Sequence, residues 1–130
     1  MAEEHANVSL IKRFDPRDLS TAASLFAPDA VFHFFNPRLP DIQGDYVGLD
    51  AIKSFFENLG STTKGSFQVQ PISLTPVGEE LVVMHTQNRM TIEDETIVTD
   101  VVLVWRVVGG RIAEVWDIPS VHTKAVPLDD

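Results

Sequence analysis

The spacing of apolar residues divides the chain into a helical first half and an extended second half. The short stretch 9–14 predicts a helix that ends before Pro16. Asp15-Pro16 then predicts the start of a second helix, because aspartate caps free N–H groups and proline suits the first helical position. Pro28-Asp29 is predicted to end this second helix. Its predicted buried face consists of Leu19, Ala22, Ala23, Phe26 and Ala27.

A strand and a third helix are predicted next. Residues 30–35 are rich in aromatic side chains and are followed by Asn36-Pro37, which predicts a strand. Residues 38–48 predict a loop. A helix is predicted to begin around Gly48-Leu49-Asp50, with Asp50 as its cap, and to end at Gly60. Its apolar stripe consists of Ala51, Ile52, Phe55, Phe56 and Leu59.

Everything after Gly65 is rich in Val, Ile and Thr and predicts four strands in series. Residues 93–95 and Gly109-Gly110 predict tight turns between them. Helices that precede a run of antiparallel strands are typical of an α+β fold. Strands of this length twist, so we expect a curved sheet whose concave face the helices cover. The four predicted strands span residues 67–75, 80–92, 96–108 and 111–118.

The length of 130 residues predicts one domain, residues 1–130, with a core at about 6–118 and a C-terminal tail at 119–130. The apolar content of 44% is typical of a globular core. No apolar run approaches the roughly 20 residues that a membrane helix needs. There is no cysteine, and the acidic start of the chain lacks the pattern of a secretory signal, so we expect a cytoplasmic protein.

The charge pattern excludes two classes of partner. The formal net charge is −9, and the ten basic residues are scattered along the chain. Binding to nucleic acid and to anionic membranes depends on clustered Lys and Arg. We therefore expect neither as a partner.

Four segments carry a resemblance to the nuclear-transport-factor-two-like superfamily, in its SnoaL-like and ketosteroid-isomerase-like branch. The resemblance as a whole extends over about residues 6–118. The resemblance implies a cone-shaped, curved antiparallel or mixed sheet, with about three N-terminal helices packed on its concave face around a pocket. It also implies a homodimer through the convex sheet face. The segments are residues 24–33, 44–52, 100–106 and 110–117.

The resemblance does not imply a reaction, because this fold supports isomerases, cyclases, hydrolases, dehydratases and non-catalytic domains. Ketosteroid isomerases need a carboxylate base and an oxyanion hole made of a tyrosine and a protonated aspartic acid. The matching positions here are Phe34, Leu10 and Leu103. Apolar side chains neither accept a proton nor donate to an oxyanion, which excludes that chemistry.

Some SnoaL-like cyclases carry an acid/base aspartate just past the tryptophan of the last strand, which makes Asp117 a candidate catalytic residue. Strand alternation places Asp117 and Trp116 on opposite faces. If Trp116 points into the cavity, Asp117 points to solvent or to an interface, unless a bulge brings both to the mouth. Both alternatives remain open from the sequence.

His85 is the other candidate acid/base, because histidine titrates near neutral pH. The alternative is a histidine that only packs in the core or at an interface. The four histidines lack the paired spacing of a metal site, so neither a metal nor a cofactor is expected. The segment 85–89 also lacks the carboxylate of the Asp-Arg-Asp cluster used by epoxide hydrolases.

The pocket lining is predicted from strand alternation, with Tyr46 at the rim. Asp100 is expected to face away from the cavity together with Val102 and Val104, which would form the dimer surface. The predicted ligand-binding residues are Phe32, Phe34, Tyr46, Phe55, Phe56, His85, Gln87, Val101, Leu103, Trp105, Trp116 and Ile118.

The sequence thus predicts a domain that binds a small apolar molecule. Whether it is an enzyme stays open; an enzyme would transfer a proton on a hydrophobic substrate, as in an isomerisation, cyclisation or dehydration. The alternative is a non-catalytic dimeric domain for protein association, with its core filled by its own aromatic side chains.

Overall fold

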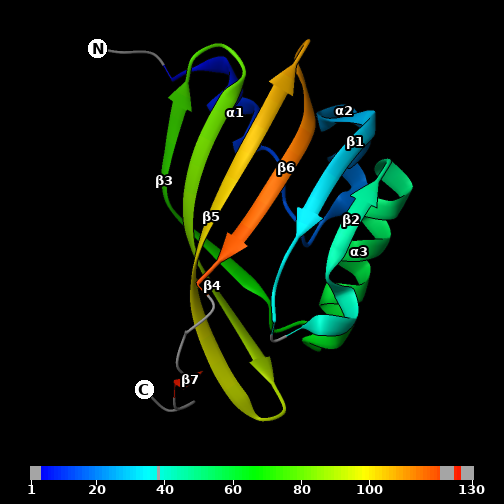
Figure 1. Cartoon of the computed structure of the whole chain (residues 1–130), viewed down its shortest axis with the longest axis vertical. Coiled ribbons are helices and arrows are strands. Elements are labelled where there is room, and N and C mark those ends of the chain that lie inside the picture. The colour runs from blue at the N-terminus through cyan, green and yellow to red at the C-terminus, as the bar shows by residue number, and fades with distance from the viewer. Residues whose placement is uncertain (1–3, 38, 121–124, 127–130) are drawn as a thin grey trace.

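The computed structural model describes residues 4–37, 39–120 and 125–126. Its first half contains short helical elements and two strands (Figure 1). None of its described helices is long and apolar enough to cross a membrane. The elements are α1 (Ala6–Lys12), two 3-10 turns (Leu19–Thr21 and Pro40–Ile42), α2 (Ala22–Leu25), β1 (Phe26–Phe34), β2 (Gly44–Val47) and α3 (Leu49–Thr62).

The second half is the predicted run of antiparallel strands. The sheet order is β2-β1-β6-β5-β4-β3, with β7 paired to β5. β1 lies parallel to β6, so the sheet is mixed, and the predicted α+β class with a curved sheet is confirmed. The strands are β3 (Gln68–Val77), β4 (Leu81–Ile92), β5 (Glu95–Val108), β6 (Arg111–Pro119) and β7 (Ala125–Val126).

Two hairpin turns fall where they were predicted. Glu93 and Asp94 join β4 to β5 with φ angles of 50° and 66°, and Gly109 and Gly110 join β5 to β6 with φ angles of 62° and 78°. Positive φ at both central residues matches the twist of the flanking strands. Glycine adopts this conformation without a Cβ clash, which explains the glycine pair.

The predicted second helix is wrong in its extent. Only Leu19–Leu25 is helical, as a 3-10 turn followed by α2, and β1 already begins at Phe26. Pro28 does not end a helix but lies within β1, where the pairing with β6 shifts register between Phe26 and Val31. Proline has no N–H to donate to a neighbouring strand, so within a sheet it occurs where the regular pairing is interrupted, as it is here.

Two other boundaries also differ from the prediction. The predicted loop 38–48 contains the short edge strand β2, which pairs with β1 in the register Phe32↔Tyr46. α3 continues through Gly60 to Thr62, and its N-cap residue is Gly48 instead of Asp50.

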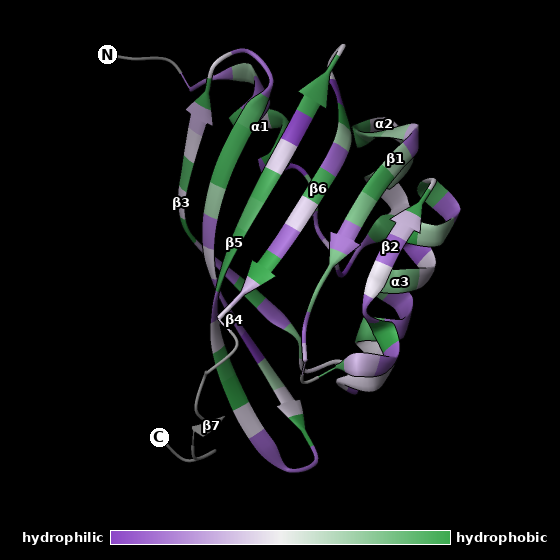
Figure 2. Ribbon diagram, viewed as in Figure 1, coloured by the Kyte–Doolittle hydropathy of each residue, from purple (hydrophilic) through white to green (hydrophobic). Residues whose placement is uncertain are grey.

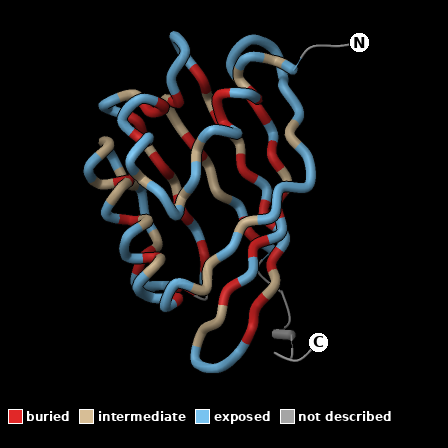
Figure 3. The backbone as a smooth tube through the Cα atoms, turned by 180° about the vertical axis from the view of Figure 1, so that it is seen from behind, coloured by how far each residue is buried: buried red, intermediate tan, exposed pale blue. Residues whose placement is uncertain are grey.

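The long strands have one buried and one exposed face (Figures 2 and 3). Along β4 and β5, buried and more exposed residues alternate, as the period of two requires. α1 contacts β3 and β4, whereas α3 contacts β1 and β2. The buried residues of α3 are Ile52, Phe55 and Leu59. The buried face of the sheet, called the inner face below, is therefore the one that forms the core.

Candidate functional site

A cavity of about 770 Å³ lies between the inner face of the sheet, α1 and the segment that follows α1. Most of its wall is apolar. Lys12, Asp15 and Arg17 are its charged residues on the helical side. Its wall on β1, β4, β5 and β6 consists of Phe32, Met84, Thr86, Asn88, Leu103, Trp105 and Asp117.

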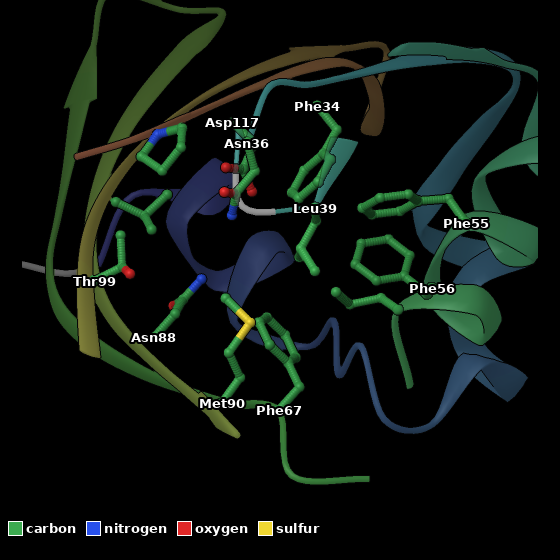
Figure 4. Close-up of a pocket in the computed structure, with 13 residues that line it drawn as sticks. Phe34, Asn36, Leu39, Phe55, Phe56, Phe67, Asn88, Met90, Thr99 and Asp117 are labelled. Atoms are coloured by element: carbon green, nitrogen blue, oxygen red, sulfur yellow. The ribbon is translucent and has the colours of Figure 1, made fainter. Parts of the chain in front are cut away.

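A second, smaller space of about 30 Å³ adjoins the large cavity (Figure 4). Polar and apolar side chains line it together, including the buried Asn36 and Thr99. Four residues border both spaces, so a molecule in the large cavity lies next to the small one. These four are Phe56, Phe67, Asn88 and Asp117.

Asp117 is the carboxyl group that both spaces share. In the sheet it lies in register with Phe34 on one side and Leu103 on the other. The structure records no hydrogen bond to its side chain from any residue it describes. Burial among these apolar neighbours raises the pKa of Asp117 from its ordinary value of 3.8 to about 7. Such a carboxyl group both accepts and donates protons at neutral pH.

Trp116 lies on the opposite face of the sheet from Asp117, and the expectation that it points into the cavity is wrong. Its indole stacks on the His33 ring, with centroids 5.4 Å apart and an interplanar angle of 18°. The Arg106 guanidinium lies 5.5 Å from the Trp116 ring. These contacts hold the tryptophan on the outer face, so alternation turns Asp117 inward.

His85 and Gln87 also lie on the outer face, away from both spaces. The Nε2 atom of His85 is 2.9 Å from Oδ1 of Asp100. This hydrogen bond lowers the pKa of Asp100, and Gln87 contributes further to the lowering. The prediction had assigned His85 to the wrong side of β4, whose buried residues are Val82, Met84, Thr86, Asn88 and Met90.

The other predicted ligand-binding residues divide into two groups. Tyr46 borders neither space, because its hydroxyl donates to the Ile42 carbonyl at 2.5 Å and its ring packs on Phe55 at 4.8 Å. Ile118 is 54% exposed on the outer face. The residues that do border one or both spaces are Phe32, Phe34, Phe55, Phe56, Val101, Leu103 and Trp105.

Thr86 and Asn88 are polar site residues that the sequence prediction missed. Both are buried on β4, and the Thr86 hydroxyl donates to Oδ1 of Asn88 at 2.9 Å. The signal for them was present in the sequence. They alternate in phase with Met84 and Met90, which places them on the apolar face of the strand.

The sequence model of the SnoaL-like domain matches residues 8–115. A search of curated proteins gave no match. Among solved structures, Bal32a from a soil-derived mobile gene cassette is similar at 21% identity, covering 88% of each chain with a TM-score of 0.78. TerC, co-crystallised with polyporic acid, is similar at 20% identity, covering 89% of this chain and 92% of its own, with a TM-score of 0.76.

IdmH from Streptomyces antibioticus, described as a candidate polyketide cyclase, is similar at 19% identity. The match covers 89% of this chain and 93% of IdmH, with a TM-score of 0.69. At these identities the three structures show the shared fold alone. The family match covers most of the chain, and the fold agrees with it. The chain therefore belongs to the SnoaL-like domain family.

Proposed function

We propose that this domain binds a small, largely apolar molecule in the cavity and that Asp117 exchanges a proton with it. The observation that carries the proposal is the Asp117 carboxyl group, with a pKa of about 7, on the sheet side of a mainly apolar cavity of about 770 Å³. A general acid or base is most effective when its pKa lies near the working pH. Perturbed carboxyl groups in clefts are typical of functional sites.

The chemistry follows from the two protonation states of Asp117. The carboxylate form accepts a proton from the bound molecule, and the protonated form returns one to another atom of it. These are the steps of an isomerisation, a cyclisation or a dehydration. TerC was co-crystallised with polyporic acid and IdmH is described as a candidate polyketide cyclase, which supports an organic substrate of the polyketide kind beside an apolar wall.

The test uses 5-nitrobenzisoxazole, a flat aromatic probe that needs only a base. When a carboxylate removes its ring C–H proton, the N–O bond breaks and a coloured cyanophenolate forms. We expect the purified domain to accelerate this ring opening, with a rate that rises with pH through about 7 as Asp117 ionises. Asp117→Asn should reduce the rate to that of the buffer.

The control is Asp29→Asn, which removes an exposed carboxyl group on β1, outside both spaces. This variant should react as fast as the unaltered protein. Equal rates for Asp117→Asn and the unaltered protein would show that Asp117 is not the base.

The second candidate function is association of two copies through the outer face. Exposed apolar side chains support it, since Val83 is 37% exposed and Val102 is 39% exposed on adjacent strands. Exposed apolar patches of this kind mark contact surfaces. Sedimentation equilibrium at micromolar concentration tests it, and a monomer would contradict it. Dimerisation is compatible with a functional cavity, because the two faces of the sheet are separate.

A further inference from the structure

We infer that the indole N–H of Trp105 donates a hydrogen bond to an oxygen atom of the molecule in the large cavity, at a point remote from Asp117. The ligand class is then an apolar molecule with a carbonyl or ether oxygen several bonds away from the atom that exchanges a proton. Trp105 is the residue that determines this specificity. The inference rests on the part of the proposed function that places an apolar molecule in the cavity.

The first argument is the state of the Trp105 side chain. Trp105 is 3% exposed and lines the large cavity. Its Nε1 atom is buried, and no residue that the structure describes accepts a hydrogen bond from it. Buried indole nitrogens usually have a partner, because a buried donor without one costs free energy. An acceptor on a bound molecule would remove that cost.

The second argument is that the neighbouring strands offer no acceptor side chain. Trp105 lies opposite Val82 on β4 and opposite Val115 on β6, and both valines are fully buried. Directly paired residues project from the same face of a sheet, so apolar side chains flank the indole on both sides. The indole N–H is a donor only. The atom that satisfies it must therefore come from the cavity and must be an acceptor.

Phe14 is the aromatic neighbour that a ligand would displace. The Phe14 and Trp105 rings meet in a T-shaped arrangement, with centroids 6.3 Å apart and an interplanar angle of 67°. Phe14 follows α1, is only half-buried and borders the same cavity. An aromatic ring offers an N–H at most a weak hydrogen bond. A ligand oxygen that moves the Phe14 ring aside therefore forms a stronger bond than the ring can.

The position of Trp105 relative to Asp117 defines the ligand further. Leu103 lies opposite Asp117 in the ladder, and Trp105 is the next inward residue along β5. The backbone positions of two successive inward residues are about 7 Å apart. A molecule that reaches both Asp117 and the indole N–H therefore carries its acceptor oxygen away from the reacting atom. The hydrogen bond orients the molecule and takes no part in the proton transfer.

The test compares benzophenone with diphenylmethane, which has the same two rings but a CH₂ group in place of the carbonyl. Benzophenone has no hydrogen on the carbons next to its carbonyl, so the comparison measures binding alone. The chain has two tryptophans and hence two indole N–H signals in its ¹H–¹⁵N spectrum. The signal that persists in Trp116→Phe belongs to Trp105. We expect benzophenone to move this signal farther downfield than diphenylmethane does, and to slow its exchange with D₂O more.

Affinities give a second readout, as the ratio of the diphenylmethane Kd to the benzophenone Kd from NMR titration. Trp105→Phe keeps an aromatic ring but loses the N–H, and should lower this ratio about fivefold, as one hydrogen bond allows. Trp116→Phe is the matched control, because it makes the same substitution on the outer face, and it should leave the ratio unchanged. The indole signal is measured on protein that retains Trp105, so that readout decides the question should Trp105→Phe fold poorly.

The outcomes separate this inference from the proposed function. If both probes bind and the Trp105 signal responds equally to them, the inference is overturned, while benzisoxazole ring opening that still depends on Asp117 leaves the proposed function intact. If ring opening does not depend on Asp117 but benzophenone alone shifts the Trp105 signal, the proposed proton exchange fails and the Trp105 site stands. If neither probe binds, the cavity does not take a molecule of this class, which overturns the inference.

Discussion

The two faces of the sheet carry the same kinds of ionisable group in opposite environments. On the outer face, His33 lies between two carboxylates, with its Nδ1 2.7 Å from Asp45 and its Nε2 2.6 Å from Glu114. On the inner face, Asp117 has apolar neighbours and no hydrogen bond recorded within the described residues. The two carboxylates raise the pKa of His33 and so favour its charged form. The apolar surroundings of Asp117 raise the pKa of that carboxyl group to about 7, which favours its neutral form.

The two environments are close neighbours along one strand. Glu114 and Trp116 point outward from β6, and Asp117 points inward from the adjacent position. The environment of an ionisable side chain on β6 therefore depends on the face of the sheet to which it points.

The apolar residues at the positions that ketosteroid isomerase chemistry requires to be polar also affect the environment of Asp117. Phe34 and Leu103 stand where that chemistry needs polar groups, and both are in register with Asp117. They cannot transfer protons themselves, but they desolvate the carboxyl group that can. The proposed acid/base group, Asp117, thus lies on the strand next to the one that carries Phe34.

The largest expected effect concerns stability. Asp117 has a higher pKa in the folded protein than in the unfolded chain, so the folded state is progressively destabilised as pH rises from about 4 to about 7. Asp117→Asn removes this titration. We expect the variant to gain a few kcal/mol in free energy of unfolding at pH 8, at most about 4 kcal/mol, and little at pH 4. Urea unfolding at the two pH values measures it.

The control for this prediction is again Asp29→Asn. An exposed carboxyl group without a recorded partner should change the free energy of unfolding by less than about 0.5 kcal/mol. If Asp117→Asn shows the same small change at both pH values, the inner carboxyl group is not desolvated and the contrast between the faces disappears.

The sequence predicted the fold better than it predicted the site, and the reason is physical. The segments 81–92 and 95–108 are rich in Val, Ile and Thr and are bounded by turn residues, which determines the strands, and buried residues follow a period of two along most of each strand. The same period leaves two choices for which face is buried. Taking Trp116 as an inward residue decided that choice wrongly for β6. The contacts of Trp116 with His33 and Arg106 join three strands, and no local pattern reveals them.

A second prediction tests whether Leu103 is a cause of the raised pKa. Leu103→Asn places an amide donor next to Asp117 on the adjacent strand, and a hydrogen bond to the charged form favours that form. We expect the pKa of Asp117 to fall by about one unit, measured by NMR of a ¹³C-labelled carboxyl group. Leu103→Met is the matched control, because it keeps the neighbour apolar and should keep the pKa near 7. A folded Leu103→Asn protein with an unchanged pKa would assign the desolvation to other residues.

The smallest expected effect is on the outer face, at His33. Burial lowers the pKa of His33, but the hydrogen bonds to Glu114 and Asp45 raise it by more, so the net change is upward. The stability that this raised pKa provides is complete below pH 6.5, the ordinary value, and is lost as pH rises through the folded pKa above it. His33→Gln should therefore cost less than about 1 kcal/mol at pH 6 and still less at pH 9, because partly exposed ion pairs contribute little.

The dependence of stability on salt concentration should distinguish His33 from Asp117. Added salt should reduce the effect of His33→Gln, since it screens the two carboxylates, but should leave the effect of Asp117→Asn nearly unchanged, since desolvation is not a pairwise attraction. Urea unfolding at low and high ionic strength measures both. Equal salt sensitivity of the two variants would mean that Asp117 also acts through a charged partner, and the difference between the inner and outer faces would then be one of degree.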